Sequence, residues 1–180
     1  MGSDKAHLEL AGVTLLSLAV QTLTRALEQL GEPSADVWVS GKDQPGFRCL
    51  PDRKPARGPL AGIDAAMVAF PGFRLAVLPV DMPLVSPGLL SRLIAESGDS
   101  DAASFAGHEM PVTLRATPLA RAVVEDLLGL GSHGKAGSVR ELLARLGARA
   151  LPLPEGAREE LANCNTPKEW ERLNHQPKQQ

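Results

Sequence analysis

The chain has 180 residues, of which 43% are hydrophobic and 22% charged, and its formal net charge is −2 at pH 7. This length suits one domain that buries about 70% of its unfolded surface, and the composition excludes an intrinsically disordered chain. The slightly negative charge predicts no nucleic-acid partner and no membrane-surface partner, since both favour a basic face. The two cysteines form no CxxC pair, and the four histidines lack metal-ligand spacing, which disfavours a disulfide framework or a zinc site.

An apolar run from Leu10 to Val20 has the length of a signal-peptide core. Its upstream flank carries Asp4 and Glu9 against Lys5, so it lacks the clear positive charge of a signal peptide. No apolar run reaches the length needed to cross a membrane. Together with the two isolated cysteines, which suit a reducing compartment, these features predict a cytoplasmic protein.

Helical and extended patterns alternate along the chain. Apolar residues at helical spacing predict a first helix over 14–31, and the β-branched stretch 36–40 predicts a short buried strand before a loop over 41–58. The nearly continuous apolar run 73–81 predicts a central parallel strand. The other predicted elements are helices over 59–70, 86–96, 118–128, 138–146 and 166–173, and strands over 102–105, 112–115 and 148–153. This alternation predicts an α/β domain over residues 1–173 with a mostly parallel sheet, followed by a loose polar tail over 174–180.

Asp81, in LPVDMP, follows the clearest predicted strand. In open α/β sheets ligands bind beyond the carboxyl ends of strands, and Mg²⁺ is often held by one or two carboxylates plus substrate phosphates. A turn-capping aspartate is the alternative interpretation.

A second candidate is PDRKPARGPLAG, in which Asp52 precedes a predicted helix and Gly58 and Gly62 flank its start. Glycines there permit close approach of a ligand, and the amides of a helix start favour anions. The alternative is a solvated loop followed by a glycine-rich packing helix.

Residues 129–136 read GLGSHGKA, which nearly matches the phosphate-loop pattern GxxxxGK[ST]. Ala136 stands where the magnesium-binding hydroxyl is needed, and a predicted helix precedes the stretch where a strand is required. We therefore interpret it as a helix-to-helix loop.

Asn163 and Asn165, in NCNTP, place two amide side chains on the same side of an extended segment. Thr166 before Pro167 predicts a helix cap, which accounts for the second half of this stretch but not for the asparagines.

In order, MGxDKA, PDxxPxxGPLAGI, VDMP and NxNTPxxW resemble the MobA-like molybdenum cofactor guanylyltransferases, from Met1 to about Leu173. The resemblance implies a Rossmann-like, three-layer α/β fold. It also implies transfer of GMP from GTP to molybdopterin, with Mg²⁺ as cofactor and pyrophosphate as product, and molybdoenzymes or their chaperones as further partners.

The resemblance assigns roles to particular residues. Lys5 and Asp81 would be catalytic, with Lys5 neutralising the triphosphate and Asp81 holding the metal. Gly2, Asp52 and Gly62 would bind the nucleotide together with them. Asn163 and Asn165 would lie on the molybdopterin side.

The family's nucleotide loop reads approximately LAGGxSxRMGxDKA, and Met1 falls on its methionine. The glycine-rich front of that loop and the first strand before it therefore have no counterpart, and we expect the natural start to lie upstream. A start left over from cloning is the alternative interpretation of MGS.

Two other functions compete with guanylyl transfer. Where relatives often place asparagine after the second strand, the stretch VSGKD offers Ser40, Gly41 and Lys42, which leaves open a CTP-dependent cytidylyltransferase. A non-catalytic protein that binds a molybdoenzyme or its assembly machinery is the alternative from another class.

Overall fold

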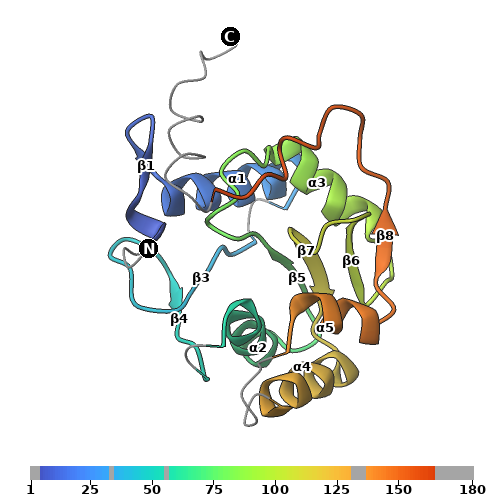
Figure 1. The fold of residues 1–180 in the computed structure, drawn as a ribbon. Helices are drawn as coiled ribbons and strands as arrows, with labels where there is room; N and C mark the ends of the chain where they lie inside the picture. The colour runs from blue at the N-terminus through green and yellow to red at the C-terminus, as the bar shows by residue number, and fades with distance from the viewer. Residues whose placement is uncertain (1–4, 33–34, 55–56, 131–136, 165–180) are drawn as a thin grey trace.

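The computed structural model describes residues 5–32, 35–54, 57–130 and 137–164. The helices are η1 (Lys5–His7, a 3-10 turn), α1 (Leu15–Gln29), α2 (Pro59–Ala69), α3 (Pro87–Glu96), α4 (Pro118–Leu130) and α5 (Val139–Arg145). The strands are β1 (Glu9–Leu10), β2 (Val13–Thr14), β3 (Val39–Ser40), β4 (Cys49–Leu50), β5 (Arg74–Val77), β6 (Ala102–Phe105), β7 (Val112–Arg115) and β8 (Arg149–Leu151) (Figure 1).

The main sheet has four described strands in the order β5-β7-β6-β8. Strand β7 runs antiparallel to both of its neighbours, and β6 and β8 are parallel. Strands β5, β6 and β8 therefore point the same way, so their carboxyl ends lie at one edge of the sheet. The reversed β7 makes the sheet mixed, although three of these four strands share the predicted direction.

Strand β5 differs from its prediction in length and in place. It covers Arg74–Val77 rather than 73–81, and Pro79, which has no N–H to donate to a ladder, follows shortly after its end. Among the described residues β5 pairs only with β7, so it lies at an edge rather than in the centre. An apolar run indicates that both faces of a strand are covered, and all four β5 residues are indeed partly buried. The run does not indicate whether the strand has one or two hydrogen-bonded neighbours.

Strands β3 and β4 form a separate parallel pair. The sequence predicts loop where β4 (Cys49–Leu50) lies, and that prediction is wrong for these residues. A strand of two residues is too short to show an alternating pattern. Helix α2 contacts β3, β4 and β5, and so links the small pair to the main sheet.

Side chains cap the starts of helices α1 and α3. The Thr14 side chain accepts a hydrogen bond from the Ser17 amide at 3.2 Å, and Ser86 accepts one from Leu89 at 3.1 Å. Each cap satisfies an amide that has no partner inside the helix, which is typically worth about 1 kcal/mol.

The core has two parts, one on each face of the main sheet. Ala102 of β6 belongs to the cluster formed with α2, α4 and α5, whereas Ala103 and Phe105 belong to the cluster formed with α1 and α3. Figure 1 shows these two sets of helices on opposite sides of the strands. The arrangement confirms the predicted Rossmann-like, three-layer architecture.

Within the described ranges, no helix is both long enough and apolar enough to cross a membrane. The apolar run Leu10–Val20 is divided between the β1–β2 hairpin and the start of α1.

Candidate functional site

Asp81 lies in the turn that follows β5, at the carboxyl edge of the sheet, and is partly buried. Its backbone carbonyl accepts a hydrogen bond from the Cys164 amide at 2.7 Å. The neighbouring Asn163 is exposed, while Cys164 itself is buried. The Asp81 turn and residues 163–164, distant in sequence, are therefore adjacent in the fold.

The segment after β8 is anchored to the loop after β5 at further points. The Glu160 carboxylate accepts a hydrogen bond from the Ser86 amide at 3.0 Å. Ala157 and Leu161 pack in the same cluster as Met82. These contacts hold Asn163 beside Asp81 through the backbone, so both side chains are carried by fixed chain segments.

A second group lies where β3 and β4 meet the start of α2. The Ser40 hydroxyl donates a hydrogen bond to Asp52 Oδ1 at 2.8 Å. Gly62, in the first turns of α2, packs directly on this pair: a Cβ added there would lie 2.3 Å from Ser40 Oγ. Asp52 and Gly62, both predicted site residues, are thus brought together, with Ser40 between them.

Asp64, two residues further along α2 than Gly62, is a buried carboxylate whose side chain is 5% exposed. Arg53 reaches it with an N···O distance of 3.3 Å. Because Arg53 follows Asp52 directly, the ion pair ties the loop that carries Asp52 to helix α2. Burying a charged carboxylate costs free energy unless an opposite charge or hydrogen bonds compensate it. Arg53 provides that compensation here.

A hollow of about 310 Å³ lies near the carboxyl ends of β6 and β8, a volume at the lower end of those typical of ligand pockets. Its wall includes the 104–109 segment, Arg140 and Ala150. Arg140 pairs with Glu109 at 2.7 Å. None of the predicted site residues that the structure describes lines this hollow.

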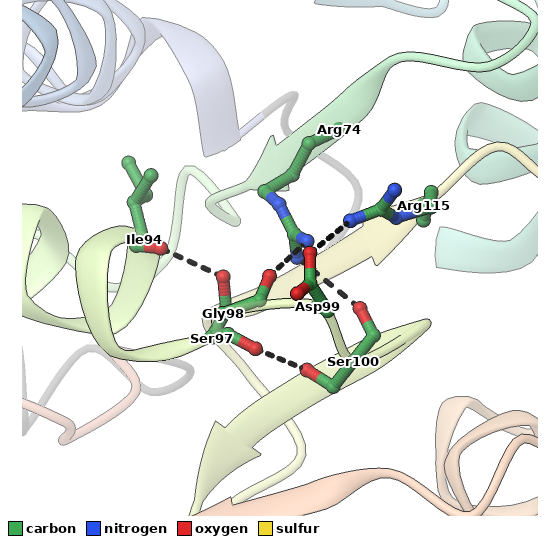
Figure 2. A network of polar contacts seen from close by, with 7 residues as sticks. All are labelled: Arg74, Ile94, Ser97, Gly98, Asp99, Ser100 and Arg115. Atoms are coloured by element: carbon green, nitrogen blue, oxygen red, sulfur yellow. Dashed lines mark hydrogen bonds and ion pairs between the residues drawn. The ribbon is translucent and has the colours of Figure 1, made fainter.

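The opposite, amino edge of the sheet holds a network of arginines (Figure 2). Arg74 and Arg115 face each other across β5 and β7. Arg74 donates to the carbonyls of Gly98 and Ser100, and Arg115 pairs with Asp99 at 3.3 Å. Burial, and then the nearby charge of Arg115, lower the pKa of Arg74. These guanidinium groups hold the loop before β6 and lie at the edge away from Asp81, so they are structural rather than phosphate ligands.

The structure locates the other predicted residues only in part. Lys5 opens the η1 turn, and η1 contacts α1. Gly2 and Asn165 lie outside the described residues, as do the helix predicted over 166–173 and the tail over 174–180. Lys135 and Ala136 of the rejected phosphate-loop pattern are also outside them.

Sequence reasoning considered Ser40 only in the choice between GTP and CTP, and it did not single out Asp64. For the contact that Ser40 makes, the available signal is a hydroxyl at the end of a predicted strand, where ligands gather in α/β sheets. For Asp64 it is a carboxylate inside an otherwise apolar helix, which needs a partner when buried.

Within the parts of the chain that the structure describes, no group of three or more His, Cys, Asp or Glu side chains is placed to hold a metal ion. Asp81 offers one carboxylate from a fixed turn. A single protein carboxylate fits a magnesium ion that binds together with a nucleotide, since waters and phosphate oxygens supply the other ligands of such an ion.

Two comparisons with solved structures show the fold. A nucleotidyl transferase from Methanothermobacter thermautotroptrophicus superposes with a TM-score of 0.68 and 19% identity, covering 94% of this chain and 83% of that one. The 2-C-methyl-D-erythritol 4-phosphate cytidylyltransferase from Thermus thermophilus gives a TM-score of 0.65 and 18% identity, covering 96% of this chain and 93% of that one.

Sequence comparisons identify the family. The molybdenum cofactor guanylyltransferase of Xanthomonas euvesicatoria pv. vesicatoria (strain 85-10) is 33% identical over 177 residues, which cover 98% of this chain and 88% of that protein. The probable molybdenum cofactor guanylyltransferase of Opitutus terrae is 30% identical over 180 residues, covering 96% and 87%. Residues 1–150 match the MobA-like NTP transferase domain. With its three-layer fold and these relatives, the chain belongs to the MobA-like NTP transferase family and is a nucleotidyltransferase.

Proposed function

We propose that this nucleotidyltransferase moves GMP from GTP to molybdopterin, forming the guanine dinucleotide form of the molybdenum cofactor and releasing pyrophosphate. The observation that carries the proposal is the 2.7 Å hydrogen bond between the Cys164 amide and the Asp81 carbonyl. This contact places the turn that carries the Asp81 carboxylate, a candidate metal ligand, next to Asn163 at the carboxyl edge of the sheet. Ligands bind at this edge in α/β folds. The guanylyltransferase relatives support the choice of substrates.

In the proposed mechanism a terminal phosphate oxygen of molybdopterin attacks the α-phosphorus of GTP. The bond from that phosphorus to the bridging oxygen of pyrophosphate breaks, and pyrophosphate leaves with the electron pair. Little acid–base chemistry by the protein is required, because positioning of the two phosphates and neutralisation of their charge lower the barrier.

The Asp81 carboxylate would hold Mg²⁺, which when bound offsets the charge of the phosphate oxygens. The partly buried position of Asp81, in a turn anchored by Cys164, keeps the carboxylate at a fixed place on the sheet edge. Lys5 would add positive charge at the triphosphate.

The remaining residues would bind the two substrates. Asp52, with Gly62 behind it and Gly2 at the phosphates, would contact the nucleotide. Asn163 and Asn165 would orient the phosphate of molybdopterin with their amide groups. Asn163 is exposed beside the Asp81 turn, which supports a role toward an incoming substrate.

A CTP-dependent reaction is the alternative within the same chemistry. The observation that favours it is the stretch after the second predicted strand, which offers Ser40, Gly41 and Lys42, where the resemblance to the guanylyltransferases implies an asparagine. We favour GTP because the relatives that cover nearly all of this chain are guanylyltransferases. Molybdoenzymes or their chaperones would receive the product, in the cytoplasm.

The experiment incubates the purified full chain with molybdopterin, Mg²⁺ and either GTP or CTP, and measures pyrophosphate release and dinucleotide formation. We expect Mg²⁺-dependent formation of the guanine dinucleotide with GTP and, with CTP, a reaction slower by about tenfold or more, the discrimination that a misplaced hydrogen-bonding group imposes. A preference for CTP would move the assignment to cytidylyl transfer. Absence of Mg²⁺-dependent GTP binding would favour a non-catalytic binding protein.

A further inference from the structure

Ser40 makes the polar contact that fixes Asp52. Its hydroxyl donates to Asp52 Oδ1 at 2.8 Å, and among the described residues this serine is the hydrogen-bond partner of the Asp52 side chain. We infer that Ser40 is a positioning residue that orients the Asp52 carboxylate for a nucleotide. The inference rests on the proposed role of Asp52 in nucleotide binding.

The backbone places the two side chains in register. Strands β3 and β4 are parallel, with Ser40 opposite Leu50. The Val39 amide donates to the Arg48 carbonyl at 2.8 Å, and the Gly41 amide donates to the Leu50 carbonyl at 2.9 Å. Asp52 comes two residues after Leu50, just beyond the end of β4, and its carboxylate lies within hydrogen-bond distance of the Ser40 hydroxyl. The serine hydroxyl therefore reaches the carboxylate without any displacement of the chain.

Gly62 provides the space in which Ser40 sits. A Cβ at position 62 would lie 2.3 Å from Ser40 Oγ, 2.9 Å from Ser40 Cβ and 3.9 Å from Asp52 Oδ1. The first two distances are too short for any real contact, whereas the third is an ordinary one. The absence of a side chain at Gly62 is thus needed first for Ser40, and through Ser40 for Asp52.

The loop that carries Asp52 has a second anchor on α2. Arg53 pairs with the buried Asp64 at 3.3 Å, so the residue after Asp52 is held as well. Because Oδ1 of Asp52 accepts from Ser40, the Oδ2 atom is the oxygen that we expect to accept from a ligand. A hydroxyl or N–H donor of a nucleoside is the chemical group that this oxygen would bind.

The test is a double-mutant cycle in the full chain with Ser40→Ala, Asp52→Ala and the two combined. Calorimetry measures the Kd for GTP in the presence of Mg²⁺. We expect Ser40→Ala to raise Kd about fivefold, as loss of one hydrogen bond to a partly exposed carboxylate would. In the Asp52→Ala background the same change should alter Kd by less than about twofold, because Ser40 then has no side-chain acceptor to orient.

Ser91→Ala is the matched control. The Ser91 hydroxyl, on α3, also donates a hydrogen bond to a side chain of another element, Gln29 of α1, at 3.1 Å. This variant should leave Kd unchanged. An unchanged Kd in Ser40→Ala would overturn the inference, as would an equal loss with and without Asp52. Ser40→Ala should raise the KM for GTP more than it lowers kcat. A general loss of folded protein would lower kcat and leave KM unchanged, so this split separates the two explanations.

A chain that does not bind GTP at all would instead overturn the proposed function. The same four proteins then still test the contact, through their urea midpoints. If the double variant loses less stability than the two single variants summed, Ser40 remains the residue that holds Asp52. If the losses of stability add, that role is rejected.

Discussion

The Cys164 amide and the Asp81 carbonyl, joined by a 2.7 Å hydrogen bond, connect the turn after β5 to the last described segment of the chain. The contact uses only backbone atoms and does not involve the side chains of Asp81 and Asn163. The Asp81 side chain can therefore be changed without breaking the link that places it.

Asp81→Asn removes the charge that would hold Mg²⁺ and keeps the size of the side chain. We expect Mg²⁺-dependent GMP transfer to fall by about 100-fold or more, the scale on which loss of one electrostatic stabiliser acts. The backbone contact with Cys164 is kept in this variant, because it is made by the Asp81 carbonyl. Asp99→Asn, an exposed carboxylate at the other edge of the sheet, is the control and should retain full transfer.

Asn163→Ala removes an exposed amide next to the Asp81 turn. We expect the KM for molybdopterin to rise about tenfold, as loss of one hydrogen bond to a charged phosphate would produce, while the Kd for GTP stays the same. Steady-state kinetics with molybdopterin varied at saturating GTP measures this. Glu159→Ala, exposed on the same segment, should change neither constant. A weaker GTP affinity in Asn163→Ala would place this asparagine on the nucleotide side instead.

Gly62→Ala places a methyl group 2.3 Å from Ser40 Oγ. We expect the free energy of unfolding to fall by about 1–3 kcal/mol, the usual cost of overpacking, as measured by urea denaturation. Ser40→Gly in the same chain should recover part of the loss because it removes both atoms that clash. Gly88→Ala is the matched control: its added Cβ meets only Ser86 Oγ, at 4.0 Å, so this helical alanine should be neutral or stabilising.

Arg53→Met leaves the buried Asp64 carboxylate without its ion-pair partner. Loss of one partner of a fully buried pair costs about 3–5 kcal/mol. Because the Arg53 side chain is 45% exposed, we expect a smaller loss of unfolding free energy, of about 1–3 kcal/mol. Adding Asp64→Leu should recover most of it, since an apolar side chain suits the buried position.

The control for that pair is Arg92→Met, which breaks a surface i,i+4 pair with Glu96. Such pairs contribute about 0.3–0.5 kcal/mol, so the change should be small. Equal losses in Arg53→Met and Arg92→Met would show that Arg53 does not compensate the buried carboxylate.

Much of the local structure is determined by the sequence alone. Thr14 and Ser86 mark the starts of α1 and α3, and apolar stretches correspond to β6 and β7 at their predicted positions. Caps and periodicities are local, because each depends on residues a few positions apart. The position of Asp81 after an apolar strand, and the order of motifs that resembles the family, are equally readable in one dimension.

Only the tertiary structure decided which segments meet. The reversal of β7 between β5 and β6, and the edge position of β5 among the described strands, depend on pairing between segments far apart in the chain. No periodicity encodes that Ser40 donates to Asp52 over Gly62 or that the Cys164 amide reaches the Asp81 carbonyl. These contacts arise from packing of whole elements against one another. The residues of the site are therefore visible in the sequence, and their grouping is a property of the fold.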